Sequence, residues 1–280
     1  MTWSQIATQP WMLWRRQVAA ILRLELKKSL FSKRAWWIYI LTLGPVVITG
    51  LHSLFPGNGG HTLGEDNMIF AGIFQVYYLR LGIFFGCLGI FSNLFRAEVL
   101  ERTLHYYFMS PVRREVLVFS KYLAGLVAAV TYFTGSVVLS FLFISAHWGA
   151  VFQQYLFHGP GLAQLGWYAV TAALACVGYG SVFLLSGIII RNPLIPAAIV
   201  FVWENLNPFL PSLLKKISVI FYLKSLCPAG DTVEGPLAIL ITTTNPTPAW
   251  LAIPGLLLVS ALVLAYAATK SRNMEVTYSD

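Results

Sequence analysis

Long runs of apolar residues dominate the chain, and short polar or charged segments separate them. A helix needs about 20 apolar residues to cross a bilayer, and it satisfies its own backbone hydrogen bonds there. We therefore expect an all-α membrane protein with six transmembrane helices. The expected spans lie at about 35–55, 68–95, 119–146, 163–190, from about 194 onward, and 250–269.

The fifth expected span is interrupted. Pro196, Pro208 and Pro211 punctuate it, and proline disrupts a helix interior because it lacks a backbone N–H. The next apolar stretch, ISVIFYLKSLCP, is too short to cross a bilayer. We expect a broken or re-entrant segment between spans five and six, within residues 208–249.

The N-terminal segment, residues 1–34, is expected to form a cytoplasmic, interfacial amphipathic helix. Apolar and basic residues there fall at helical spacing on different faces. The apolar stripe is Trp14, Val18, Ile21, Leu22 and Leu26, and the basic residues are Arg15, Arg16, Arg23, Lys27 and Lys28. The alternative is an ordinary basic flank that only orients the first span.

Composition supports one membrane domain, residues 35–269, followed by a cytoplasmic tail, 270–280. Of the 280 residues, 57% are hydrophobic and 11% charged, with a mean hydropathy of +0.69, which a water-soluble domain does not show. Cys87, Cys176 and Cys227 are far apart, so neither a disulfide framework nor a metal site is expected.

The net charge of +8 arises from Lys and Arg clustered at helix ends, which argues against a nucleic-acid partner and for membrane orientation. With the N-terminus inside, most cations flank the cytoplasmic ends of spans. The inner cations are Arg15, Arg16, Arg23, Lys27, Lys28, Lys33, Arg34, Arg96, Arg102, Arg113, Arg114, Lys121, Arg191, Lys270 and Arg272, and the outer ones are Lys215, Lys216 and Lys224. The protein is expected in the cell membrane with both termini cytoplasmic.

The longest charged stretch, residues 96–118, lies on the cytoplasmic side between spans two and three. Its first part, 96–108, has helical spacing, Ser110 and Pro111 break it, and Arg113 opens the next helix. The pattern predicts a helix, a turn and a helix at the membrane surface. It indicates a docking surface for a soluble partner, or else a solvated loop whose charges only fix topology.

This stretch resembles the region between spans two and three of type-2 ABC exporter permeases, which docks on the nucleotide-binding subunit. Glu98 and Glu101 match the acidic pair of that region, and Thr103 and Leu104 match its Thr-Leu step. Pro111 matches the turn, and Arg113 and Arg114 match the basic position, with Glu115 next in the sequence. Lys121 matches the Lys that opens span three. Arg102 and Ser120 stand where the family often has Gly. The resemblance implies a cytoplasmic coupling helix here.

A phosphate loop of the Gly-x4-Gly-Lys-Ser/Thr type is absent from the sequence, so no catalytic residue is assigned. The resemblance implies a separate ABC ATPase subunit that binds ATP and Mg, with no cofactor or metal in this chain. It also implies a homodimer or a heterodimer with a related permease, in contact with membrane lipid. The expected function is a permease subunit of an ATP-driven exporter, and the transported substrate stays open.

Two charged residues fall inside expected spans at matching depth, Arg80 in span two and Glu204 in span five. A charge in hydrocarbon is costly, so one hypothesis is that they form an ion pair, within one subunit or across a dimer. In the alternative, each reaches the outer interface on its own. Asn205 and Asn207 either line a cavity or cap the broken helix before Pro208.

Two other classes compete with this interpretation. A rhomboid-type hydrolase needs Gly-x-Ser-Gly and a later His, but span four offers Gly178-Tyr-Gly-Ser181 and no His follows His158. Glu98 and Glu101 faintly resemble the paired glutamates of some membrane proteases, with His105 alone nearby as a further metal ligand. An ion-coupled transporter or channel would need more ionisable residues inside the spans.

Overall fold

The structure is a computed structural model that describes residues 11–31, 36–55, 62–100, 109, 112–190, 192–215, 218–228 and 247–272. All elements assigned within these residues are helices. They are α2 (Trp11–Phe31), α3 (Trp36–Leu54), α4 (Leu63–Ile73), the π-helix η2 (Phe74–Gly82), α5 (Ile83–Leu100), α7 (Arg114–Ile144), η3 (Ala146–Trp148), α8 (Ala150–His158), α9 (Gly161–Ile189), α10 (Leu194–Leu206), η4 (Asn207–Phe209), α11 (Ser212–Lys215), α12 (Val219–Leu226) and α13 (Ala249–Arg272).

Five helical stretches in the described part of the chain are long and apolar enough to cross a membrane. They are Trp36–Leu54, Leu63–Glu98, Arg114–Trp148, Gly161–Ile189 and Ala249–Arg272. These agree with the first four expected spans and the last one. The second and third contain 36 and 35 residues. At 1.5 Å per residue each is about 50 Å long, so their ends project beyond a hydrocarbon core of about 30 Å.

The expected count of six spans is not confirmed, because the fifth does not form a continuous helix. α10 has 13 residues and gives way at Asn207 to the short helix η4. α11 and α12 follow with four and eight residues. The prolines predicted the break correctly, while a re-entrant course in a membrane stays a prediction.

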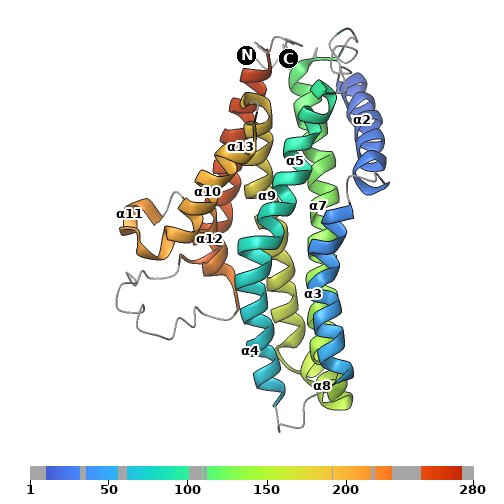
Figure 1. Ribbon diagram of the computed structural model, residues 1–280, viewed down its shortest axis with the longest axis vertical. Helices are drawn as coiled ribbons and strands as arrows, with labels where there is room; N and C mark the ends of the chain where they lie inside the picture. Colours follow the sequence, from blue (N-terminus) through green and yellow to red (C-terminus); the bar gives the residue numbers. More distant parts are fainter. Residues whose placement is uncertain are drawn as a thin grey trace.

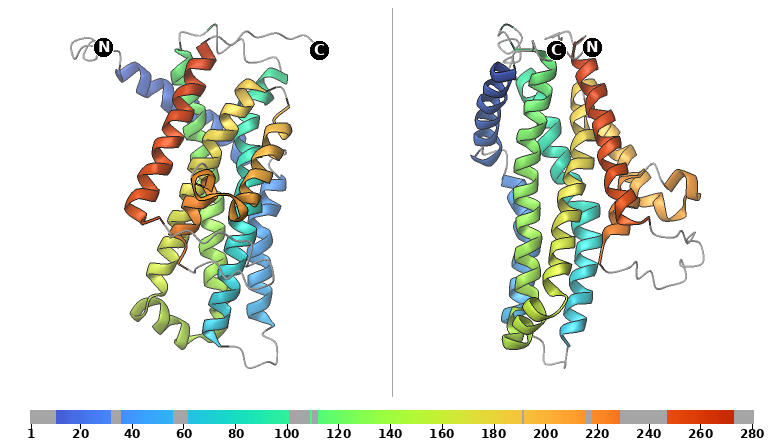
Figure 2. Two further views of the ribbon diagram at one scale, coloured as in Figure 1. Left: turned by 90° about the vertical axis from the view of Figure 1, so that its left-hand side faces the viewer. Right: turned by 180° about the vertical axis from the view of Figure 1, so that it is seen from behind.

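The bundle has two distinct ends. In Figure 1 the end marked by α2 also holds the end of α5, the start of α7 and the last turns of α13, and α8 marks the opposite end. We call the first of these the α2 end. Because α13 returns to the α2 end while α10 to α12 reach only partway down, the broken segment takes the place of a continuous fifth span (Figures 1 and 2).

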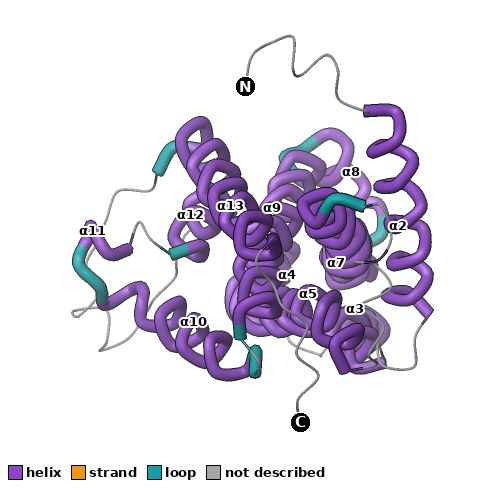
Figure 3. Tube along the Cα trace, turned by 90° about the horizontal axis from the view of Figure 1, so that it is seen from above, coloured by secondary structure: helices purple, strands orange, loops and turns teal. Residues whose placement is uncertain are grey.

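The core lies between α5, α7 and α9, which occupy the centre when the molecule is seen from above (Figure 3). Aromatic side chains fill it, among them Phe91 and Phe133, both fully buried. Glycines let these rings approach a neighbouring helix. A Cβ atom at Gly86 would lie 2.0 Å from Cζ of Phe133, and one at Gly89 would lie 1.9 Å from Cζ2 of Trp37. Gly86 and Gly89 therefore allow α5 to pack closely against its neighbours.

Helix α2 packs along α7 (Figure 3). The predicted apolar stripe is its more buried face. Ile21 is buried and Trp14, Val18, Leu22 and Leu26 are partly buried. The five basic residues assigned to the opposite side are all exposed. The amphipathic pattern is thus confirmed for the described residues 11–28, although nothing in the structure places α2 at a membrane interface.

Candidate functional site

The strongest polar feature is an ionic cluster at the α2 end. Lys121 of α7 is fully buried, and its Nζ donates hydrogen bonds to Glu25 Oε1 of α2 at 2.6 Å and to Glu98 Oε1 of α5 at 2.7 Å. A third bond reaches the carbonyl oxygen of Leu94 at 2.9 Å. Lys28 adds an outer contact, with Nζ 3.8 Å from Glu98 Oε1. We call Glu25, Glu98 and Lys121 the Lys121 cluster.

The Lys121 cluster joins three separate helices through one ammonium group. A lysine has three N–H donors, and here all three have acceptors, so the buried charge is compensated. Glu25 and Glu98 are also buried, at 4% and 3% exposure. Breaking a buried ion pair leaves an uncompensated charge in a medium of low dielectric. The ends of α2, α5 and α7 are therefore held together as one unit.

Glu25 did not stand out in the sequence, because it is one acidic residue among the basic residues of an amphipathic helix. The spacing offers a signal in retrospect. Glu25 is four residues beyond Ile21, so it lies on the same inward face of α2. A lone carboxylate on the apolar side of a helix predicts a buried basic partner, and Lys121 is that partner.

The first turn of α7 makes contacts to both sides. The Arg113 guanidinium lies over the Trp14 ring of α2, with Cζ 5.0 Å from the ring centroid. Arg114 Nη1 donates to the carbonyl oxygens of Ser271 and Arg272 at 3.1 and 2.6 Å. These carbonyls lie at the C-terminus of α13, where a cation is favoured. Glu115 and Arg272 form an ion pair on the surface.

The predicted coupling residues therefore divide into two groups. The first group lies within the described residues. In it, Glu98 and Lys121 are in direct contact, and Arg113, Arg114 and Glu115 tie the start of α7 to α2 and α13. The second group lies outside the described residues and consists of Glu101, Arg102, Thr103, Leu104 and Pro111. In Figure 1, α5 ends and α7 begins at the α2 end, so the helices before and after these residues in the sequence both lie at the end that holds the Lys121 cluster.

The hypothesis of an ion pair between Arg80 and Glu204 within one chain is wrong. Glu204 is 5% exposed, and its carboxylate accepts hydrogen bonds from Ser218 Oγ at 2.6 Å and from the backbone N–H groups of Val219 and Ile220 at 3.0 and 2.9 Å. Glu204 thus caps the N-terminus of α12, which favours a negative charge. No ion pair with Arg80 forms among the described residues.

Asn205 and Asn207, which follow Glu204, both donate hydrogen bonds to backbone carbonyl oxygens nearby in the sequence. Asn205 Nδ2 donates to the carbonyl oxygen of Phe201 at 2.8 Å, one turn back in α10. Asn207 is buried, and its Nδ2 donates to the carbonyl oxygen of Lys215 at 3.2 Å. Asn207 therefore braces the turn between η4 and the end of α11. This bond serves α11 and not the end of α10, so capping of the broken helix stays a prediction.

A second polar cluster, which the sequence analysis did not identify, closes the opposite end. Asp66 in the first turn of α4 is fully buried, with Oδ1 3.3 Å from His52 Nε2 of α3 and Oδ2 3.4 Å from His147 Nε2 of η3. Trp148 Nε1 donates to Asp66 Oδ2 at 2.8 Å. Asp66 thus ties together the end of α3, the start of α4 and η3.

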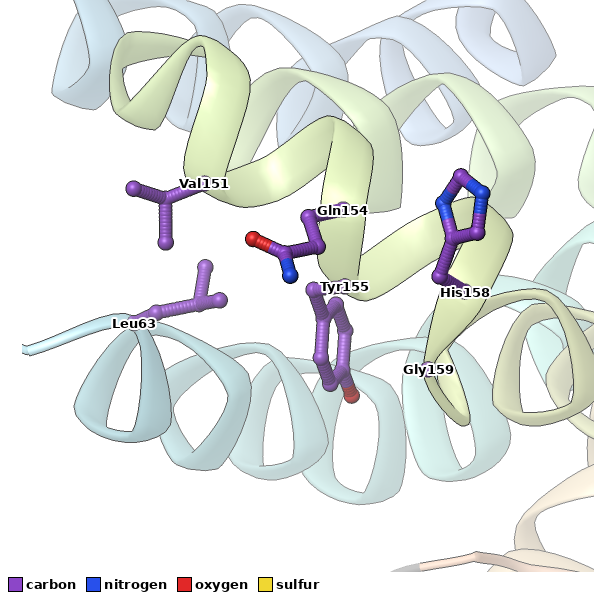
Figure 4. Close-up of a pocket in the computed structure, with 6 residues that line it drawn as sticks. All are labelled: Leu63, Val151, Gln154, Tyr155, His158 and Gly159. Carbon is purple, nitrogen blue, oxygen red and sulfur yellow. The ribbon is translucent and has the colours of Figure 1, made fainter.

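A shallow hollow of about 330 Å³ opens at the same end, beside α4 and α8. Figure 4 shows its lining, which is Leu63, Val151, Gln154, Tyr155, His158 and Gly159. Tyr155 donates its hydroxyl to Gln164 Oε1 at 2.6 Å. The hollow lies far from the Lys121 cluster along the bundle, so it is not part of that site (Figure 1).

No curated protein matches the chain. The sequence model of ABC-2 family transporter proteins matches residues 21–207, which begin within α2 and end at the start of η4. This match covers Glu25, Glu98 and Lys121 and four of the five helices that can span a membrane. The chain belongs to the ABC-2 family of transporter proteins.

Proposed function

We propose that this chain is the permease subunit of an ATP-driven exporter whose ATPase subunit docks at the α2 end. Membership of the ABC-2 family makes the chain a membrane transport subunit that is not itself catalytic. The observation that supports the docking site is the Lys121 cluster, which binds α2, α5 and α7 together near the end of α5 and the start of α7, the helices before and after residues 101–111 in the sequence.

The proposed mechanism follows from the rigidity of that cluster. A partner that pushes on the segment 101–111 acts on the end of α5 and the start of α7, and both helices belong to stretches long and apolar enough to cross a membrane. Separating them at the Lys121 cluster would expose buried charges without partners, which is strongly unfavourable. The three helices therefore move together, and movement of the ATPase reaches the membrane interior through two spans.

The remaining parts of the proposal are inferred from the family resemblance and from charge. ATP and Mg bind to the ATPase subunit, and two permease subunits, identical or related, enclose the transport path. The excess of Lys and Arg at the α2 end supports a cytoplasmic location for that end, in the cell membrane. The ATPase then lies in the cytoplasm, where ATP is available.

Copurification tests the proposal. The tagged chain is extracted in mild detergent from its native cells, and the bound protein is assayed for ATP hydrolysis and for a phosphate-loop sequence. The double variant Glu101→Gln/Arg113→Gln should lose about 90% of the bound ATPase, because charge-assisted contacts dominate such a surface. Lys224→Gln, which removes a cation from α12, is the matched control and should retain the ATPase. Full retention by the double variant would refute docking at this segment.

A further inference from the structure

Arg80 occupies an unusual place in the structure. It lies 17 residues after Leu63 and 18 before Glu98, so it is in the middle of the second candidate span. It also belongs to η2, a π-helix of nine residues. π-Helical turns are rare and occur often at functional sites, since the extra residue per turn re-aims side chains. A charged residue at this depth is itself a functional-site hypothesis.

The guanidinium of Arg80 lacks a counter-ion. Among the described residues no carboxylate forms an ion pair with it, and its Nε atom is buried without a hydrogen-bond partner. Glu204, the carboxylate at matching depth, already receives three hydrogen bonds from the start of α12. Glu204 is also buried in its own chain, so it cannot reach a second copy without losing those bonds. Arg80 as a whole is only partly buried, so a ligand can approach it.

The surroundings of Arg80 include one further polar group. η2 contacts both α9 and α12. The Tyr179 hydroxyl of α9 is buried, interacts with the Glu204 carboxylate and lies within electrostatic reach of Arg80. The Glu204 charge would oppose an incoming anion, but the hydrogen bonds from Ser218 and the N-terminus of α12 offset it. The positive charge of Arg80 is therefore the less compensated of the two charges, and it favours an added acceptor with negative charge.

We propose that Arg80 binds the anionic group of an amphiphile, and that this group belongs to the transported molecule. A guanidinium presents paired N–H donors that match phosphate and carboxylate oxygens, and such bonds are strong where water is excluded. A position in the middle of a span favours an anion that carries an apolar tail. The assignment to the transported molecule rests on the proposed transport function, whereas the binding site itself does not.

Direct binding to the purified chain tests the site without any ATPase. Native mass spectrometry in neutral detergent compares dodecyl phosphate, dodecyltrimethylammonium and inorganic phosphate, at about 0.5 M salt to weaken binding to the basic surface. Dodecyl phosphate should bind at least about tenfold more tightly than the cation. Arg80→Gln should lose about tenfold in that affinity, and Arg80→Lys should retain part of it. Arg23→Gln, which removes an exposed arginine of α2, is the matched control.

Equal binding of dodecyl phosphate by wild type and Arg80→Gln would overturn the proposal, and so would an equal loss in Arg23→Gln. Inorganic phosphate that binds as tightly as dodecyl phosphate would overturn the amphiphile assignment in favour of a soluble anion. Thermal unfolding separates binding from structure. Because Arg80 has no partner in the described chain, Arg80→Gln should not lower the unfolding temperature, and a clear decrease would show a structural ion pair instead.

Discussion

Lys121 stands in an apolar helix face, where a lysine is tolerated only if its charge is paired. Its ammonium group has two carboxylates and one carbonyl as acceptors, and all three charged side chains are shielded from water. Such a cluster adds little net stability compared with an apolar replacement, but it is costly to break in part. Its role is specificity, because only the correct register of α2, α5 and α7 satisfies all three groups.

Removing only the cation should therefore destabilise the protein strongly. Lys121→Met leaves Glu25 and Glu98 as buried neighbours of like charge, and we expect a loss of about 3–5 kcal/mol in the free energy of unfolding. Thermal unfolding in detergent, followed by circular dichroism, measures it. The triple variant Lys121→Met/Glu25→Gln/Glu98→Gln should recover most of the loss.

The surface pair at the same end provides the control for this prediction. Glu115 and Arg272 have side-chain exposures of 33% and 63%. Solvent screening makes such pairs weak, so Glu115→Gln should cost at most about 1 kcal/mol. A larger effect for Glu115→Gln than for Lys121→Met would show that the buried cluster does not hold the helices together.

At the opposite end of the bundle, Asp66 joins helix ends as the Lys121 cluster does at the α2 end. Asp66→Asn keeps an oxygen for Trp148 but removes the charge that faces His52 and His147, and we expect a loss of about 1–3 kcal/mol. The change in unfolding temperature reports it. Glu65→Gln affects the neighbouring, exposed capping position and should cost less than Asp66→Asn. If the two variants are equally stable, Asp66 does not tie these helix ends together.

At the scale of elements, the packing of α5 against its neighbours depends on positions without side chains. Gly86 and Gly89 are three residues apart in α5, one facing Phe133 of α7 and the other Trp37 of α3. Residues three apart lie on adjoining parts of one helix surface. The two glycines therefore leave a shallow depression on α5, against which the two rings pack. Substitution there forces rings or helices to shift.

Gly86→Ala should destabilise the bundle by about 1–3 kcal/mol through overpacking, because the new methyl group would lie 2.0 Å from Phe133. Unfolding temperature in detergent is again the measurement. Gly135→Ala in α7 is the control, since nothing lies within 4 Å of its added Cβ and alanine favours a helix. Adding Phe133→Leu to Gly86→Ala should restore part of the stability. If Gly86→Ala has the same unfolding temperature as the wild type, the Phe133 ring can move aside without cost, and overpacking at this position is refuted.

At the scale of the whole molecule, the two ends of the bundle differ in charge and in chemistry. The α2 end carries most of the cations and the Lys121 cluster, and the opposite end carries Asp66 with its two histidines. A bilayer with a cytoplasmic excess of positive flanks would orient the α2 end inward. The last turns of α13 then face the cytoplasm together with α2 (Figure 2).

Cysteine labelling of intact cells tests this orientation. In a background without Cys87, Cys176 and Cys227, Glu65→Cys should react with a membrane-impermeant maleimide from outside. Lys270→Cys should react only after the membrane is permeabilised. Both positions are exposed, so burial does not confound the result. The reverse pattern would place the α2 end outside and would contradict docking of a cytoplasmic ATPase there.

The sequence by itself determined the all-helical membrane class, the five continuous spans, the break after residue 194 and the inward face of α2. Each of these follows from a local property, namely the length of an apolar run, a proline, or a spacing of three to four residues. The resemblance singled out Glu98 and Lys121 as coupling residues, but their contact is seen only in the structure. The segment 101–111 between them remains untested, because its residues lie outside those described.

Only the tertiary structure decided which helix faces meet. Glu25 lies about 100 residues from Lys121 in sequence, and its pairing depends on α2 folding back along α7. The π-helix around Arg80 was not predicted, because the few polar residues of Phe74–Gly82 do not recur at a spacing that reports its period. Arg80 and Glu204 were expected to pair because they fall at the same depth in the membrane. Depth does not determine the direction in which a side chain points around its helix axis. The return of α12 gave Glu204 other partners and left Arg80 without one.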